Sequence, residues 1–188
     1  LVENVPEFQK WGPVDRTTGK PIKIKAGMYF RAWCRKLERL GYTIEWRILC
    51  SADYGDATTR KRFFLVGRKD GQPIEWPAPT HSKTGKNGLP RWPGARTIID
   101  WNLKGKSIFD RKKPLKRKTL ERIYTGFERF GKAGEPFLFI LRRHMNGLSI
   151  DDPIPTVCAG GNHVGIAQAF ILSQGAGGAP RNVEDPIP

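Results

Sequence analysis

Two arginines at alternate positions, Arg60 and Arg62, stand directly before an apolar run, 63–66, that ends at Gly67. Because alternate residues of a β-strand point to the same side, this spacing predicts two guanidinium groups side by side at one end of a strand. Paired guanidinium groups suit a phosphate, a carboxylate or the polar edge of a nucleic-acid base. The pattern alone also fits two solvated arginines before an ordinary core strand.

The motif around these arginines, together with the opening of the chain, resembles the DNA (cytosine-5) methyltransferase family. That family carries the motif ENV and, further along, the motif YG…QxRxR…G. The first is matched by Glu3, Asn4 and Val5, and the second by Tyr54, Gly55, Arg60, Arg62 and Gly67. The family's glutamine is replaced by Thr58.

This resemblance implies an enzyme that extrudes a cytosine from DNA, adds a cysteine thiolate to C6 and transfers the methyl group of S-adenosylmethionine to C5. Addition at C6 moves negative charge onto N3, so an acid beside N3 lowers the barrier. The resemblance gives that role to Glu3, and it has Asn4 fix the local structure of the strand. It places Arg62 against the cytosine O2 and Arg60 beside it as a support for the pocket. Without the resemblance, Glu3 would be interpreted as a strand-end carboxylate paired with a lysine.

Two parts of that chemistry are missing from the sequence. The family's nucleophile lies in a Pro-Cys dipeptide, whereas Cys34, Cys50 and Cys158 all follow other residues. No glycine-rich strand-to-helix turn, of the kind that holds a nucleotide-like cofactor, is present either. We therefore expect a middle segment of an enzyme, in which S-adenosylmethionine is bound by parts absent from this chain. Cys34 and Cys50 are expected in the core.

The composition favours a polyanionic partner. Among 188 residues there are 33 Lys and Arg against 18 Asp and Glu, a net charge of +15, and double-stranded DNA is the partner that the resemblance implies. No apolar run is long enough to cross a membrane, so we expect no membrane partner. The cysteines and the three histidines show no ligand spacing, so we expect no metal site. Unpaired cysteines favour a reducing, cytoplasmic location.

The first part of the chain predicts a small α/β arrangement. Residues 1–5 are the end of a buried strand, and residues 7–25 are a loop. Apolar residues at steps of three and four predict a helix over 26–40, and alternation predicts strands over 42–48 and 62–68 that pair antiparallel. The resemblance makes 1–79 the last elements of a doubly wound methyltransferase sheet.

The second part, 80–188, is expected to be a loop-rich, small target-recognition domain that is truncated at its end. Prolines rule out regular structure over 72–93, and a short helix is predicted over 96–101. A longer helix is predicted over 116–130, with Leu120, Ile123, Tyr124 and Phe127 on its apolar face, and a short strand over 137–141.

A basic run, 104–118, contains eight Lys or Arg and one acid, Asp110. Its candidate DNA-binding residues are Lys112, Lys113, Arg117 and Lys118. We interpret the run as a surface that contacts phosphates, and a merely solvated surface is the alternative.

The last fifty residues contain a repeat, because the segment 137–155 returns 33 residues later as 170–188. Its DxPxPT-plus-glycine pattern resembles the target-recognition region of a phage-type branch of the same family. Two other interpretations of the whole chain stay open. One is a non-catalytic DNA- or RNA-binding module, and the other is one subunit of a split methyltransferase whose partner chain brings the cofactor and the cysteine.

Overall fold

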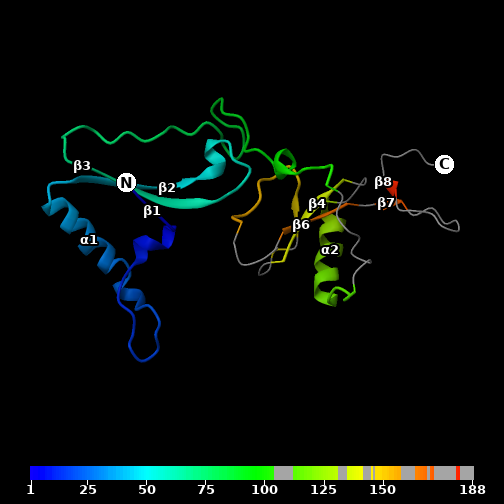
Figure 1. Ribbon diagram of the computed structural model, residues 1–188, viewed down its shortest axis with the longest axis horizontal. Coiled ribbons are helices and arrows are strands. Elements are labelled where there is room, and N and C mark those ends of the chain that lie inside the picture. The colour runs from blue at the N-terminus through cyan, green and yellow to red at the C-terminus, as the bar shows by residue number, and fades with distance from the viewer. Residues whose placement is uncertain are drawn as a thin grey trace. The chain divides into compact units, whose positions relative to one another are not determined.

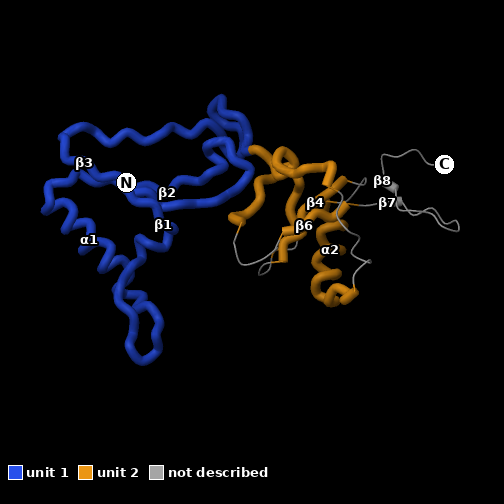
Figure 2. Tube along the Cα trace, in the orientation of Figure 1, with its two compact units in different colours: residues 1–92 blue, residues 93–188 orange. Residues whose placement is uncertain are grey.

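The computed structural model describes residues 1–103, 112–130, 135–141, 145, 147–157, 164–168, 170–171 and 181–182. The chain divides into two compact units, residues 1–92 and 93–188 (Figure 2). Among the described residues, each unit combines a three-stranded antiparallel sheet with an α-helix, and the second unit also has a two-stranded pair (Figure 1). The chain is therefore a mixed α/β protein, as the sequence predicts.

The sheet of the first unit has β3 (Lys61–Arg68) at its centre. β1 (Val2–Asn4) pairs with one edge of β3 and β2 (Thr43–Cys50) with the other, both antiparallel. Every residue of β2 has a partner on β3, from Thr43 opposite Arg68 to Cys50 opposite Lys61. The three predicted strands and the antiparallel pairing of the last two are confirmed, but β1 is an edge strand of half-buried and exposed residues and not a buried strand.

One face of this sheet is covered by α1 (Met28–Arg39), which confirms the helix predicted over 26–40. Phe30 and Cys34 of the helix pack with Phe63 and Leu65 of β3, and all four side chains are buried. The helix ends before Gly41, whose φ of +85° is the left-handed conformation that glycine adopts at low cost.

The segment predicted as a plain loop, 7–25, contains two 3₁₀ turns, which corrects that prediction. The first, η1 (Pro6–Lys10), begins with a proline whose fixed φ suits the start of a helical turn. The ring of Phe8 in this turn lies 5.5–5.7 Å from the rings of Phe30, Trp33 and Phe63. The second turn, η2 (Lys23–Lys25), has no buried residue.

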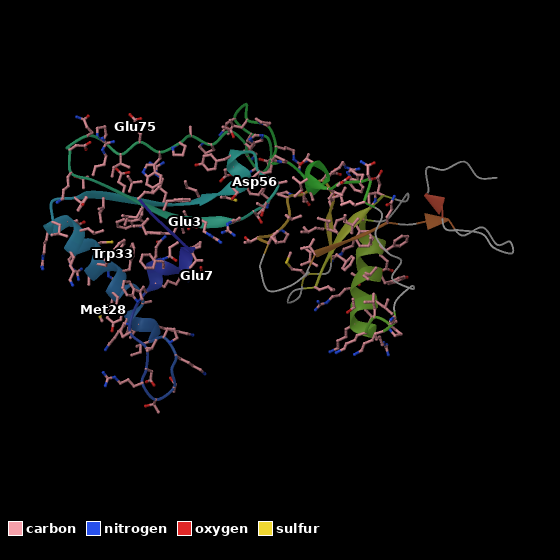
Figure 3. All side chains as sticks on the ribbon, in the orientation of Figure 1. Glu3, Glu7, Met28, Trp33, Asp56 and Glu75 are labelled. Carbon is pink, nitrogen blue, oxygen red and sulfur yellow. The ribbon has the colours of Figure 1, made fainter. Side chains whose placement is uncertain are left out.

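The opposite face of the sheet is approached by the extended segment 72–79. Its Trp76 indole donates a hydrogen bond to the Glu45 carboxylate at 2.9 Å, and the Arg47 guanidinium lies 5.0 Å from the centre of the Trp76 ring. In Figure 3, Glu75 on this segment and Trp33 on α1 lie on opposite sides of the sheet. No regular element forms here, in agreement with the prolines.

Residues 80–92 belong to the first compact unit because they are hydrogen-bonded to Asp53. Asp53 lies in the 3₁₀ turn η3 (Ser51–Tyr54), between β2 and β3. The assignment of a catalytic part to 1–79 and of a recognition part to 80–188 stays a prediction.

The second unit is built on β4 (Phe137–Ile140), which pairs antiparallel with β5 (Gly147–Ser149) and β6 (Val164–Ala167). A further pair, β7 (Phe170–Ile171) and β8 (Arg181–Asn182), is also antiparallel. The predicted strand over 137–141 is confirmed. Most of the second repeat copy lies outside the described residues, and so do 104–111, His144, Cys158 and His163.

The helix predicted over 116–130 is confirmed as α2 (Arg117–Phe130), but three of the four residues on its predicted apolar face are largely exposed. The side chains of Leu120, Tyr124 and Phe127 are 41%, 64% and 45% exposed. Gly126 is buried instead, and a Cβ at its position would lie 2.3 Å from the Phe137 ring. The missing side chain lets the helix approach β4 closely, so the face that carries Gly126 is the one that packs.

The short helix predicted over 96–101 is a 3₁₀ turn that ends earlier, η4 (Ala95–Ile98). Its Arg96 guanidinium contacts the carboxylates of Asp151 at 3.0 Å and Glu135 at 3.2 Å. The contact with Asp151 joins the turn to the first copy of the repeat.

Candidate active site

The register of β1 on β3 brings Glu3 and Arg62 to the same face of the first sheet. Glu3 lies opposite Phe64, and Arg62 lies two residues before Phe64 on the same strand. Residues in this diagonal relation are close enough for long side chains to meet. The Arg62 Nε lies 2.9 Å from the Glu3 Oε1, so the two predicted residues form an ion pair.

A hollow of about 370 Å³ lies on this face of the sheet. The residues around it are Glu3, Leu49, Cys50, Ser51, Tyr54, Arg60, Arg62, Phe64 and Pro77. Glu3, Arg60 and Arg62 thus share one hollow with the apolar side chains of Leu49 and Phe64. Its volume is within the range of small-ligand pockets, and a few charged groups among apolar walls are typical of such sites.

The contacts of Arg62 hold its guanidinium in place. Nε contacts Glu3, and Nη1 donates to the Lys61 carbonyl at 2.8 Å. The Arg62 side chain is 20% exposed, whereas that of Glu3 is 50% exposed. Because one partner is half in solvent, the pair stabilises the fold by no more than about 1 kcal/mol. A ligand that offers equivalent hydrogen bonds can therefore replace it at low cost.

Arg60 is positioned through its backbone. Its carbonyl accepts hydrogen bonds from the Ser51 backbone N–H at 2.9 Å and from the Ser51 hydroxyl at 3.2 Å. Ser51 follows the last residue of β2, so the connection between β2 and β3 is closed at this point. The Arg60 side chain is half-buried at the edge of the hollow.

Asn4 does not line the hollow. Its register partner is Phe63, on the face that α1 covers. The Asn4 Oδ1 accepts a hydrogen bond from the Val5 backbone N–H at 2.8 Å, just before Pro6 ends the strand. This contact is local, and a role for Asn4 in ordering the end of β1 stays a prediction.

Tyr54 forms a wall of the hollow. Its hydroxyl donates to the Pro77 carbonyl at 3.2 Å and so links the motif to the proline-rich segment. Burial, with a smaller contribution from the charge of Asp53, raises the pKa of Tyr54 above its ordinary value. The phenol therefore stays protonated and keeps donating this hydrogen bond at neutral and mildly alkaline pH.

The sequence did not identify Leu49, Cys50, Ser51 or Pro77 as site residues. Leu49 is the register partner of Arg62 on the neighbouring strand. The predicted antiparallel pairing of 42–48 with 62–68 could therefore have placed Leu49 beside Arg62. Pro77 had no signal beyond its place in an irregular segment. A second hollow, of about 290 Å³, lies near Arg68 and contains none of the predicted residues.

The two cysteines of the described chain are buried, as the sequence predicts. Cys34 is 5% and Cys50 6% exposed, and neither is in a disulfide. Burial, assisted by the charge of Glu38, raises the pKa of the Cys34 thiol. Cys50 also contributes to the wall of the hollow. Thr58, at the position of the family's glutamine, has a buried hydroxyl without a hydrogen-bond partner in the described chain.

The predicted DNA-binding residues of the second unit are all exposed and lie before or at the start of α2. They are Lys112, Lys113, Arg117 and Lys118. Arg117 forms an ion pair with Glu121 one helical turn further on, at 2.8 Å, and its own side chain is 92% exposed. Such a pair is weak, so a phosphate can compete for this guanidinium.

Replacing these four residues by glutamine is expected to weaken the salt dependence of DNA binding. The slope of log affinity against log salt should fall by about 0.9 for each phosphate that is no longer bound. The measurement is a titration of the chain with duplex DNA at several salt concentrations. The control replaces four exposed lysines of the first unit, Lys10, Lys20, Lys23 and Lys25, by glutamine. An equal change in the control would show that only net charge matters.

The sequence predicts neither a metal site nor a membrane partner, and the structure bears on the residues that it describes. These described residues contain no group of His, Cys, Asp and Glu that could hold a metal ion. None of the described helices has the length and apolar character needed to span a membrane.

Comparison with known proteins identifies a family for much of the chain. The family model for C-5 cytosine-specific DNA methylases matches residues 20–136, which include Arg60 and Arg62 but not Glu3. The chain is 42% identical over 48 residues to the type II methyltransferase M1.HphI of Haemophilus parahaemolyticus, 26% of this chain and 13% of that protein. It is 38% identical over 64 residues to M.Sau3AI of Staphylococcus aureus, 34% of this chain and 15% of that protein.

A third type II methyltransferase, M.SacI of Streptomyces achromogenes, is 44% identical over 46 residues, 24% of this chain and 12% of that protein. The chain thus matches only a minor part of the length of each of these relatives. No solved structure matches the chain.

Proposed function

The chain belongs to the C-5 cytosine-specific DNA methylase family, and from this we propose that it forms the base-binding pocket of a DNA (cytosine-5) methyltransferase. The observation that carries the proposal is the shared hollow, in which Glu3 is ion-paired with Arg62 and Arg60 lies at the edge. The substrate would be a cytosine extruded from double-stranded DNA. The type II methyltransferases among its relatives support a role in restriction–modification.

In this proposal Glu3 acts on N3 of the extruded cytosine. When a nucleophile adds to C6, electrons move onto N3, and a proton delivered there keeps the charge from accumulating. Glu3 would take that proton from solvent, to which its side chain is half exposed. In the structure this carboxyl group is held by the Arg62 guanidinium, so Glu3 can act on N3 only after Arg62 has released it.

Binding of the base would bring about this release. Nε and Nη1 of Arg62 are engaged by Glu3 and by the Lys61 carbonyl, and the cytosine O2 is an acceptor that can replace the carboxylate. The exchange costs little because the pair is partly solvated. Arg62 would then hold O2 while Glu3 is freed to be protonated beside N3. Arg60 would support the pocket and offset charge at its edge.

The cofactor of the family, S-adenosylmethionine, supplies the methyl group, but the described residues do not fit a site for it. β1 continues through Val5 into η1, and β2 continues directly into η3 at Ser51, so neither strand enters a helix through a glycine-rich turn. Cys34 and Cys50 follow no proline. We propose that other parts of the enzyme, in the same polypeptide or in a partner chain, supply the cofactor site and the thiolate.

The two units would have different roles in the enzyme. The three strands of the first unit would be the last strands of a doubly wound methyltransferase sheet, and the second unit would be part of the target-recognition domain. The exposed cations before and at the start of α2 support DNA binding by the second unit. The same cations favour the second candidate function, a DNA-binding module without catalysis.

The free Cys34 and Cys50 fit a reducing cytoplasm.

The two candidates are separated by a product assay on the full-length gene product. Incubated with S-adenosylmethionine and duplex DNA, it should yield 5-methylcytosine, detected by mass spectrometry after digestion of the DNA. DNA binding without any 5-methylcytosine would favour the non-catalytic module. The 188-residue chain alone should give no measurable heat of binding with S-adenosylmethionine. Micromolar affinity of this chain for the cofactor would contradict the assignment of the cofactor site to other parts.

A further inference from the structure

A second segment of the first unit is anchored beside Tyr54, which lies at one rim of the hollow, and the proposed chemistry does not use this segment. It is the segment 80–92, which reads THSKTGKNGLPRW. The backbone N–H groups of Thr80 and His81 donate to the Asp53 carbonyl at 2.9 and 3.0 Å. At the other end, the Trp92 indole donates to the Asp53 carboxylate at 2.9 Å. Both ends are therefore tied to Asp53, the residue before Tyr54.

Between these ends the chain forms a closed loop, 82–91. Ser82 and Arg91 are paired as an isolated parallel bridge. The Ser82 backbone N–H donates to the Pro90 carbonyl at 2.9 Å, and the Ser82 hydroxyl accepts from the Lys86 N–H at 3.0 Å. The loop thus has a base of fixed geometry, which reduces the conformational entropy lost when it binds a ligand.

The loop is strongly basic. It carries Lys83, Lys86 and Arg91, all exposed, and residues 80–92 contain no Asp or Glu. No carboxylate in the described part of the chain forms an ion pair with any of the three. The one carboxylate that contacts the segment, Asp53, is engaged by the Trp92 indole. Three unpaired cations on a short loop favour a ligand with several negative charges.

The backbone of the loop suits such a ligand as well. Gly85, Asn87 and Gly88 have φ values of +72°, +58° and +74°. Within the described residues the backbone N–H groups of Asn87 and Gly88 make no hydrogen bond and can be offered to an anion, whereas those of Gly85, Lys86 and Leu89 bond inside the loop. The stem of Arg91 packs over Gly85, where a Cβ would lie 3.1 Å from the Arg91 Cγ. The tight turn and the position of one cation are therefore linked.

We infer that the 82–91 loop binds phosphates of the DNA strand next to the extruded nucleotide. The inference rests on the proposed function, because the base-binding hollow fixes where the DNA backbone must pass. Tyr54 and Pro77 line the hollow, and the chain runs from Pro77 to the Asp53 anchor within a few residues. A base held in the hollow brings its own flanking phosphates to this rim.

The test uses the 188-residue chain and a mixed-sequence duplex. The loop variant changes Lys83, Lys86 and Arg91 to glutamine, and the control variant changes Lys20, Lys23 and Lys25, which are equally exposed, to glutamine. The slope of log affinity against log salt should fall by about 0.9 per unbound phosphate in the loop variant and stay near the wild-type value in the control. Equal slopes in the two variants would overturn the inference.

A second measurement, nuclear magnetic resonance of the loop, reports DNA contact at the loop itself and not only the affinity of the whole chain. The backbone amide resonances of Gly85, Asn87 and Gly88 should shift on addition of the duplex and saturate with the same affinity as the binding curve. If inorganic phosphate displaces the DNA from the loop at millimolar concentration, the loop is a small-anion site and the inference is wrong. Neither readout involves methyl transfer. A loop that binds DNA, in a gene product that forms no 5-methylcytosine, would overturn the proposed function alone.

Discussion

Replacing Glu3 by glutamine is expected to slow methyl transfer in the full-length enzyme by about 10²- to 10⁴-fold, the usual loss when a general acid is removed. The amide keeps the size of the side chain and a hydrogen bond with Arg62, but it cannot deliver a proton to N3. The acid is needed most as charge develops in the transition state, so DNA affinity should change little. The measurement is the single-turnover rate of methylation, beside the dissociation constant for DNA.

The matched control is Glu7→Gln. Glu7 is an exposed carboxylate in η1, close to Glu3 in sequence but not among the residues that line the hollow (Figure 3). The Glu7→Gln enzyme should methylate DNA at the wild-type rate. A purely structural role of Glu3 gives another result, namely a lower melting temperature with normal turnover in the folded fraction. If the Glu3→Gln enzyme methylates DNA at the wild-type rate, Glu3 of the ENV motif is not the acid that acts on N3.

The elements of the first unit could be predicted because their signals are local. The alternation in 42–48, the three- and four-residue steps in 26–40 and the glycine at position 41 each act over a few residues, and tertiary packing agrees with them. The common orientation of Arg60 and Arg62 toward the hollow also agrees with their alternate spacing. Antiparallel pairing followed from the short connection between the strands.

The parts that could not be predicted depend on contacts between distant segments. Nothing near Glu3 in the sequence indicates that its strand lies beside β3, and only the family resemblance suggested that Glu3 and Arg62 share a site. Helical periodicity gave the same weight to each apolar residue of α2. The close approach of Gly126 to Phe137 places the contact at one edge of that apolar face, so the Phe127 ring still lies 6.5 Å from the Phe137 ring while Tyr124 is exposed. Which side of α2 is buried depends on Phe137 of β4, and the sequence of the helix alone does not show where that residue lies.

Replacing Arg62 by alanine should affect both the rate and the binding of the extruded base. It removes the guanidinium proposed to hold the cytosine O2, and a hydrogen bond to a charged group is worth about 1.5–3 kcal/mol. We therefore expect retention of the extruded base to fall by about 10- to 150-fold, the same energy expressed as an equilibrium constant. The loss of the pair with Glu3 should lower stability by about 1 kcal/mol or less, because the Glu3 side chain is half exposed.

The matched control for this variant is Arg68→Ala. Arg68 lies on the same strand and the same face as Arg62, and it is also paired with a carboxylate, that of Asp70, but it lies outside the base-binding hollow. Single-turnover rate, dissociation of the enzyme from a duplex whose methylated cytosine has been mapped, and melting temperature should be measured for both variants. Arg68→Ala should keep the wild-type rate and dissociation. If the two variants lose rate and affinity equally, Arg62 only stabilises β3, and the proposed contact with the cytosine O2 is wrong.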